Sequence, residues 1–389
     1  MLSPEINRII LLLAIAISGY LIILQWDSDY SQTASTYESL PITAPLLDGE
    51  DLDVPLENLN EEPRLSDVPD NSLIASSPSA QQPSSAGATS DRLIRVRTPM
   101  VEMWIDLLGG DIIRAELPGY PFELNETGKP YILLNNGSNL VYVAQSGLIG
   151  PNGVDSGERP LYRSSQDSYD LIDGKLTVPL ETTKDGMLIT KTFVFDSEDF
   201  LVEVNYVVTN NNYTPIEASM FSQIKRDSRE PIGAVSRFMG PRAYVGGMLT
   251  TAEDNYKKIT FDDLDETSYR IEHEGGWMAV LQHYFLSAWI GNTEDKNLFF
   301  GQRRPDGTYA FGFTGPMPRI ESGQTGSWKS RLYVGPKDQK RLEQIAPNLN
   351  LTVDYGWLWW LAVPLWYILD LMHSLVGNWG LAIIFLTLI

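Results

Sequence analysis

Few residues in this chain could carry acid–base chemistry. Its three histidines are His273, His283 and His373. Isomerising a sugar requires a positioned acid and base, commonly a histidine with a glutamate, and His273-Glu274 beside His283 is the candidate set for that chemistry. However, His283 lies in an apolar run, which favours a core residue, and His273 precedes a Gly-Gly pair, which favours a loop. We therefore expect no catalytic residue.

The sequence gives no better support for a metal or a cofactor. Asp262, Asp263, Asp265 and Glu266 lie close together as calcium ligands do, but the glycine and closing glutamate of an EF-hand are missing. A solvated acidic loop is the better interpretation. The sequence contains no Gly-rich phosphate loop, HExxH or GxSxG motif, and no cysteine. We expect neither a cofactor nor a metal site.

Composition narrows the class of protein further. The chain has 389 residues, of which 43% are hydrophobic, which is enough for one large domain with accessory segments. Its net charge is −21. Because binding to phosphates requires lysine and arginine, this charge argues against a nucleic-acid partner.

From residue 91 to residue 347 the chain has the pattern of β-strands. Hydrophobic and polar residues alternate over residues 200–208, as they do in a half-buried strand. Turn residues separate other such runs: Asp-Gly at 185–186, Asp-Gly at 306–307 and Gly-Gly at 109–110. Many strands at short spacing indicate a mainly β fold, a large antiparallel β-sandwich, although periodicity alone leaves a barrel open.

Two segments near the end of this domain need separate interpretation. Residues 277–290 fit a strand or a helix, and in either form they should belong to the core. Residues 337–346 predict a short helix with Leu342 and Ile345 on one face, ending before Pro347. This helix would join the sandwich to the C-terminal segment.

The N-terminal part of the chain predicts a membrane anchor followed by a linker. Residues 9–26 form an apolar run without charge, about 27 Å long as a helix. Arg8 precedes the run and acids follow it, which places residues 1–8 in the cytoplasm. A cleaved signal peptide is the alternative, but the run is long and lacks a cleavage site of small residues.

Residues 27–90 differ sharply in composition from the rest. They contain twelve acids and one base, Arg64, and so carry a charge of −11. Low hydrophobicity combined with like charge predicts an acidic disordered linker. We interpret it as a solvated tether, with an acidic docking tail as the alternative.

The C-terminal segment carries two membrane signals. Residues 348–378 are rich in Trp, Tyr and Leu, as expected of an amphipathic helix in the membrane interface. Pro364 would fit its first turn, and Asp370 with His373 would form either a polar site or its solvated face. The predicted interface residues are Trp357, Trp359, Trp360, Leu365, Trp366, Leu369, Met372 and Trp379.

Gly377-Asn378 should end this helix, and residues 379–389 then read as the start of a second transmembrane helix. Eleven residues span about 16 Å as a helix, whereas a bilayer core is roughly 30 Å thick. Open helix-end carbonyls are costly in lipid. We therefore expect the chain to be the N-terminal part of a longer membrane protein.

Several long motifs resemble one family in the right order. LTVDYGWLWWLAVPLW (351–366) and HSLVGNWG (373–380) resemble the entry to the second transmembrane helix of the YidC-type membrane protein insertases. The other motifs resemble the large periplasmic domain of that family: GGDIIRAELPGYP (109–121), SGLIG (146–150), GGWMAVLQHYFLSAWI (275–290) and YVGPK (333–337).

The resemblance implies a twisted supersandwich similar to that of sugar mutarotases, and a protein that is not an enzyme. It implies an insertase and chaperone for inner-membrane proteins, acting alone or with the Sec translocon. The implied partners are nascent membrane proteins, Sec translocon components and the lipid bilayer. The implied location is the bacterial inner membrane, with the large domain in the periplasm. The substrate groove and its arginine would lie beyond Ile389.

The alternative function is a membrane-anchored carbohydrate-binding or mutarotase-like domain. An exposed cleft lined by Trp or Tyr with converging carboxylates would favour it. A filled sandwich face would instead favour a scaffold that contacts proteins.

Overall fold

The computed structural model describes residue 69 and residues 92–123, 128–137, 140–229, 244–251, 255–353 and 359–388. The predicted anchor, 9–26, lies outside these residues, as does the predicted linker, 27–90, apart from residue 69. Both therefore stay predictions. The chain divides into two units, Met1–Glu61 and Glu62–Ile389, and the elements below belong to the second.

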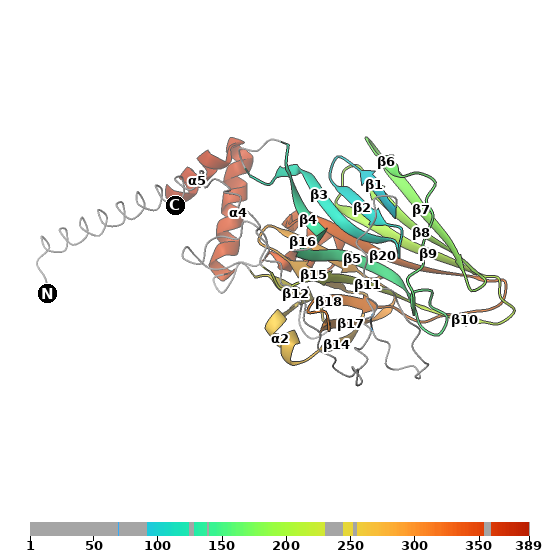
Figure 1. Ribbon diagram of the computed structural model, residues 1–389. Coiled ribbons are helices and arrows are strands. Elements are labelled where there is room, and N and C mark those ends of the chain that lie inside the picture. Colours follow the sequence, from blue (N-terminus) through green and yellow to red (C-terminus); the bar gives the residue numbers. More distant parts are fainter. Residues whose placement is uncertain are drawn as a thin grey trace, which may run out of the picture. The chain divides into compact units, whose positions relative to one another are not determined.

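Two large sheets make up most of the described chain (Figure 1). In the described ranges the larger sheet has ten strands, in the order β14 (Tyr269–Glu274), β17 (Lys296–Arg303), β18 (Tyr309–Thr314), β11 (Ser219–Arg226), β5 (Leu140–Ile149), β4 (Pro130–Gly137), β3 (Asp111–Pro121), β2 (Glu102–Asp106), β1 (Leu93–Arg97) and β6 (Ser168–Asp170). As far as the chain is described, the second sheet has eight strands, in the order β13 (Lys257–Ile259), β12 (Gly246–Leu249), β15 (Trp277–Leu281), β16 (Phe285–Ile290), β20 (Thr325–Pro336), β9 (Leu201–Asn210), β8 (Met187–Asp196) and β7 (Lys175–Lys184).

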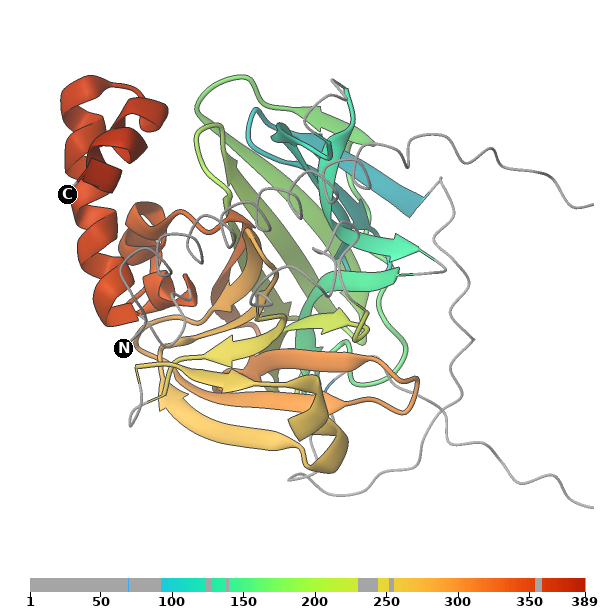
Figure 2. The same cartoon turned by 90° about the vertical axis from the view of Figure 1, so that its left-hand side faces the viewer.

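Smaller elements complete the fold. A two-stranded ribbon joins β10 (Ile216–Glu217) to β19 (Arg319–Ile320). The helices are α2 (Phe261–Glu266), α3 (Gln339–Ile345), the 3₁₀ helix η2 (Leu349–Thr352), α4 (Trp359–Val376) and α5 (Trp379–Leu388). Figure 2 shows α4 and α5 as the red helices next to the C-terminal end.

The strand pairing is antiparallel in all described pairs except β1 with β6. The three predicted turns are confirmed, because strands end on either side of each one. Asp185 and Gly186 connect β7 to β8 with φ of 48° and 71°, as a tight type I′ hairpin requires. Gly307 has φ 80° between β17 and β18, and the Gly-Gly pair connects β2 to β3.

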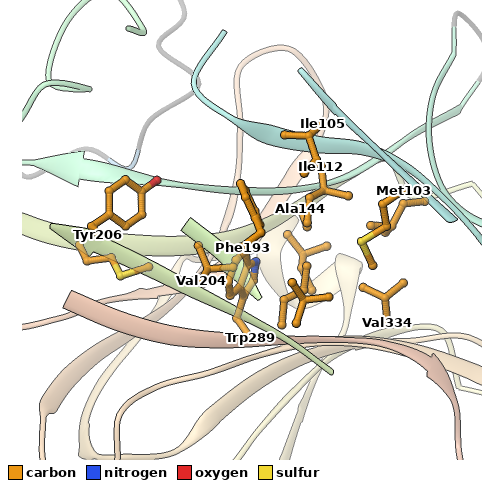
Figure 3. Packing of buried hydrophobic residues seen from close by; sticks show 14 of the residues in the cluster. Met103, Ile105, Ile112, Ala144, Phe193, Val204, Tyr206, Trp289 and Val334 are labelled. Atoms are coloured by element: carbon orange, nitrogen blue, oxygen red, sulfur yellow. The ribbon is translucent and has the colours of Figure 1, made fainter. Parts of the chain in front are cut away.

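The sheets pack face to face, and their inward-facing side chains form the main core. β9 shows why, since its buried residues alternate with residues that face outward. The sandwich expected from the alternation is therefore confirmed. Figure 3 shows members of this core from both sheets: Met103, Ile105, Ile112, Ala144, Phe193, Val204, Tyr206, Trp289 and Val334.

Residues 277–290 form the antiparallel hairpin β15–β16, whose two strands belong to the core, as expected, while His283 and Tyr284 in the turn do not. Their pattern was ambiguous because β15 is buried on both faces. Met278 and Val280 face the main core, whereas Trp277 and Ala279 face a second cluster that includes side chains of α3. A strand covered on both faces reads as a continuous apolar run, which periodicity cannot distinguish from a buried helix.

The acidic stretch around Asp262 is not a loop, so that prediction was wrong. It forms the helix α2, whose capping box explains the difference. The Asp263 amide donates to the Thr260 hydroxyl at 3.1 Å, and the Thr260 amide donates to the Asp263 carboxylate at 2.9 Å. These two bonds satisfy backbone donors that the helix itself leaves open.

Candidate functional site

The predicted break between two C-terminal helices is confirmed. α4 ends at Val376, and Gly377 follows with φ 66°, a conformation that suits glycine. The Gly377 amide donates to the His373 carbonyl at 2.7 Å. Asn378 then caps α5, because its side-chain oxygen accepts from the Leu381 amide at 3.2 Å.

One face of α4 is apolar and exposed. Leu371 is 57% exposed and Leu375 is 73% exposed. The other large apolar side chains exposed on α4 are Leu361, Leu365 and Tyr367. At 100° per residue these five positions lie on one side of the helix. α5 also exposes large apolar side chains: Trp379, Leu381, Ile383, Ile384, Phe385 and Leu388. We call the five exposed apolar side chains of α4, Leu361, Leu365, Tyr367, Leu371 and Leu375, the outer face of α4.

Asp370 and His373 lie on another side of α4. Asp370 accepts hydrogen bonds from the Lys340 ammonium of α3 at 3.1 and 3.3 Å, and the same ammonium lies 5.7 Å from the Trp366 ring centre. The His373 ring stacks on Trp379 with 3.7 Å between ring centres. Asp370 and His373 are both half-buried. The Asp370 side chain is still 34% exposed, so the solvated face, one of the two alternatives from the sequence, stays a prediction.

α3 connects these helices to the sandwich. Its buried residues, Leu342 and Ile345, pack in the second cluster, as the sequence predicted. The Trp277 indole of β15 donates to the Pro347 carbonyl at 2.9 Å, just beyond the helix. Arg341 forms an ion pair with Asp199 of the sandwich. One side of α3 is thus fixed to the sandwich, while its Lys340 contacts α4.

The predicted interface residues fall into three groups. Leu365 and Trp379 are exposed, whereas Trp366, Leu369 and Met372 are half-buried. Trp357 lies outside the described residues. The backbones of Trp359 and Trp360 belong to α4, but their side chains are not described. Leu361, Tyr367, Leu371 and Leu375 are further exposed apolar residues of α4, and the position of all these residues at a membrane stays a prediction.

Pro364 lies inside α4, beyond the first turn that the sequence suggested. There it removes one backbone donor from the helix. Within the described residues, no helix combines the length and the apolar character needed to cross a membrane.

The candidate acid–base residues do not form one site. His273 lies in the edge strand β14 rather than in a loop, and it lines an open pocket of about 640 Å³. His283 lies in the β15–β16 turn of the other sheet, where it stacks on Tyr284 at 4.1 Å. It is exposed, so its assignment to the core was wrong. The pocket lining is Glu272, His273, Glu274, Thr293, Glu294 and Lys296. It includes no Trp or Tyr, and so does not support the carbohydrate alternative.

Sequence reasoning missed a buried charged cluster between the sheets. The Lys191 ammonium of β8 donates to the carbonyls of Gly110 at 2.8 Å, Gly109 at 3.1 Å and Ser146 at 3.2 Å. The signal was available, because Lys191 occupies an inward-facing position of an alternating strand. Burial lowers the pKa of this ammonium to about 7, although nearby carboxylates, Asp111 first, act in the opposite direction.

Two carboxylates and a second base complete this cluster. Arg159 pairs with Asp111 and, at 2.9 Å, with Asp155. Burial raises the pKa of the Asp111 carboxyl, while Arg159 and then Lys191 lower it. Lys191 is fully buried and Asp155 almost so. The cluster therefore links the sheets, and its charged side chains are at most 9% exposed.

Together these features define a class: a two-sheet β-sandwich domain whose C-terminal helices expose apolar faces. Residues 93–368 match the family model described as the YidC periplasmic domain. The chain belongs to the family of YidC membrane protein insertases, and it is not an enzyme.

Relatives that are named membrane protein insertase YidC support this assignment. The relative from Azotobacter vinelandii is 40% identical over 399 aligned positions, which cover 99% of this chain and 68% of that protein. The relative from Cellvibrio japonicus is 44% identical over 317 positions, covering 80% of this chain and 57% of that protein.

Solved structures with a similar fold include galactose mutarotase-like proteins. A galactose mutarotase related enzyme from Lactobacillus acidophilus is 8% identical with a TM-score of 0.41, covering 62% of this chain and 97% of that one. A protein from Lactobacillus casei is 9% identical with the same TM-score, covering 62% of this chain and 99% of that one. Similarity at this level carries no argument about function.

Proposed function

We propose that this chain is the sandwich-bearing part of an insertase and chaperone for inner-membrane proteins, acting alone or with the Sec translocon. Its membership of the YidC family supports the proposal. Nascent membrane proteins would be the substrates, and the bilayer and Sec components the other partners. The proposed segments are a cytoplasmic N-terminus (1–8), an anchor (9–26), a linker (27–90), a periplasmic sandwich (91–347), an interfacial region (348–378) and the start of a second transmembrane helix (379–389).

The observation that carries the membrane part of this proposal is the outer face of α4. Its large apolar side chains are between 41% and 73% exposed, whereas Asp370 and His373 face α3 and α5. Removing one leucine side chain from water is worth about 1.5–3 kcal/mol, so several together favour a position at a lipid interface. The outer face would contact lipid, and the polar side would face the protein.

The role of α3 follows from its two sets of contacts. Leu342 and Ile345 pack in the cluster behind β15, and Lys340 reaches α4. Because both contacts come from one short helix, the sandwich would be held close to the membrane surface. The ion pair between Lys340 and Asp370 is largely exposed and is worth only about 0–1 kcal/mol, so packing must contribute more to the joint than charge does.

The test compares two neighbouring aspartate substitutions on α4. Leu375→Asp places a charge on the outer face, whereas Ser374→Asp places one at an exposed polar position. The assay uses this chain continued with the segment that the Azotobacter vinelandii relative has beyond the match. Protease protection of a model inner-membrane protein then measures insertion in cells depleted of their own insertase. We expect Leu375→Asp to lose insertion and Ser374→Asp to retain it.

Two results would contradict the proposal. Insertion by the Leu375→Asp protein at the level of Ser374→Asp would show that the outer face does not need to meet lipid. Failure of the unsubstituted continued chain to insert any substrate would refute the insertase function itself.

A further inference from the structure

Aromatic side chains gather at one end of the sandwich. Tyr131 of β4 stacks on Phe285 at the start of β16, with 4.3 Å between ring centres. Tyr120 of β3 meets the same Phe285 edge-on at 5.4 Å and lies 6.3 Å from Phe200. The Tyr131 hydroxyl donates to the Gln282 side chain at 2.7 Å. The end of β3 and the β15–β16 turn are therefore held together by packed rings from both sheets.

Three rings of this end remain open to solvent. Tyr120 is 36% exposed, Phe122 is 38% exposed and Tyr284 is 68% exposed. We call these three residues the aromatic rim. The Phe122 backbone is fixed, because its amide donates to the Lys129 carbonyl at 2.9 Å. Grouped exposed rings on an ordered scaffold mark a contact surface, and tyrosine in particular favours the lipid–water interface.

The rim adjoins the segment that leads to α4. The Lys337 amide donates to the Tyr284 carbonyl at 2.8 Å, two residues before α3 begins. Partial burial and then the Asp338 carboxylate raise the pKa of Tyr120, which places this ring near the cap of α3. Lys340 then contacts α4. Figure 1 shows β3, β4 and β16 at one end of the sandwich and β10 at the other.

We propose that Tyr120, Phe122 and Tyr284 lie in the headgroup region of the bilayer that the outer face of α4 contacts. This inference rests on the proposed function, because it requires α4 to lie at a membrane. A helix alone would leave the sandwich free to rotate about the joint at α3. A second contact to the side of the joint restricts that rotation and gives the sandwich one orientation on the membrane.

The chain contains no cysteine, so single cysteines can be labelled without altering other residues. The variants are Phe122→Cys and Tyr284→Cys on the rim, and Leu375→Cys on α4. Tyr213→Cys is the matched control, since Tyr213 is a fully exposed aromatic residue between β9 and β10. Each full chain carries a fluorophore at its cysteine. It is reconstituted in phosphatidylethanolamine–phosphatidylglycerol vesicles that contain a headgroup-nitroxide lipid as quencher.

We expect loss of fluorescence at positions 122, 284 and 375 and none at position 213. Quenching at 375 with none at 122 and 284 overturns the second contact and leaves the proposed function standing. No quenching at any of the three positions overturns both. Shielding at 122 and 284 that requires an added protein instead of lipid also overturns the inference, because the rim would then be a protein-binding surface. Thermal melts of the labelled chains confirm that each variant is folded.

Discussion

Trp277 joins the sandwich to α3. Trp277→Ala should therefore destabilise the sandwich and also weaken the attachment of α3 to it. The indole is fully buried in the cluster that contains Leu342 and Ile345 of α3. Removing a buried tryptophan side chain costs about 3–5 kcal/mol of unfolding free energy, because contacts are lost and a cavity remains. For a domain of this size each kcal/mol lowers Tm by about 2–4 °C, so a fall on the order of 10 °C is expected.

A second substitution separates packing from hydrogen bonding. Trp277→Phe keeps most of the ring but removes the indole N–H that donates to the Pro347 carbonyl at 2.9 Å. A buried acceptor left without its donor costs about 1–3 kcal/mol. Trp277→Phe should therefore destabilise the chain less than Trp277→Ala, and the difference measures the packing of the indole against α3.

The assay is urea unfolding of the full chain in detergent, followed by far-ultraviolet circular dichroism. Trp379→Ala is the matched control, because the same atoms are removed from a half-exposed residue of α5. Its unfolding free energy should fall by less than that of Trp277→Ala, because it loses the stack on His373 but leaves no buried cavity. Amide exchange in α3 should accelerate in Trp277→Ala alone. Equal midpoints for the Trp277→Ala and Trp379→Ala chains would refute the reasoning.

Two further predictions concern the sandwich. Because burial lowers the pKa of Lys191 from 10.5 to about 7, the unfolded chain binds a proton that the folded chain lacks between these values. The unfolding free energy should therefore rise from pH 7 to pH 9, and urea melts should show a shallower rise for Lys191→Met; equal slopes would contradict this. In the turns, Gly186→Ala should lower the unfolding free energy more than Gly323→Ala does in the same melts. Both glycines have φ near 70°, so both substitutions strain the backbone. A Cβ at position 186 would in addition overlap the Asn212 side chain, whereas a Cβ at position 323 would meet no atom. Equal losses of unfolding free energy would contradict this overlap.

Local signals explain which parts of the fold could be predicted. The Asp185-Gly186 turn, the alternation in β9 and the two buried positions of α3 each depend on a few adjacent residues. Turn conformation and side-chain period are set by the backbone itself, so such patterns determine their elements without knowledge of distant partners. α2 had a similar signal in Thr260 and Asp263, but the acidic composition obscured it.

The remaining features depend on partners that lie far away in the sequence. His283 was assigned to the core because apolar residues surround it, yet the chain reverses there and the Gln282 amide donates to the Phe285 carbonyl at 2.9 Å. The turn exposes His283 and Tyr284 between two buried strands. The charged cluster at Lys191 brings together residues from three distant segments, and no spacing rule predicts such a meeting.

The orientation of α4 shows the same dependence with a functional consequence. From its sequence, Asp370 could belong to a polar site or to the solvated face of the helix, and spacing alone named no partner for it. The structure supplies a partner instead, Lys340, on a helix whose other side is buried against β15. Leu371 and Leu375 are exposed on the same helix. Because the Lys340–Asp370 pair is largely exposed and weak, α3 contributes to the orientation of α4 without fixing it alone. A change at Trp277 that loosens α3 should therefore also disturb the orientation of α4.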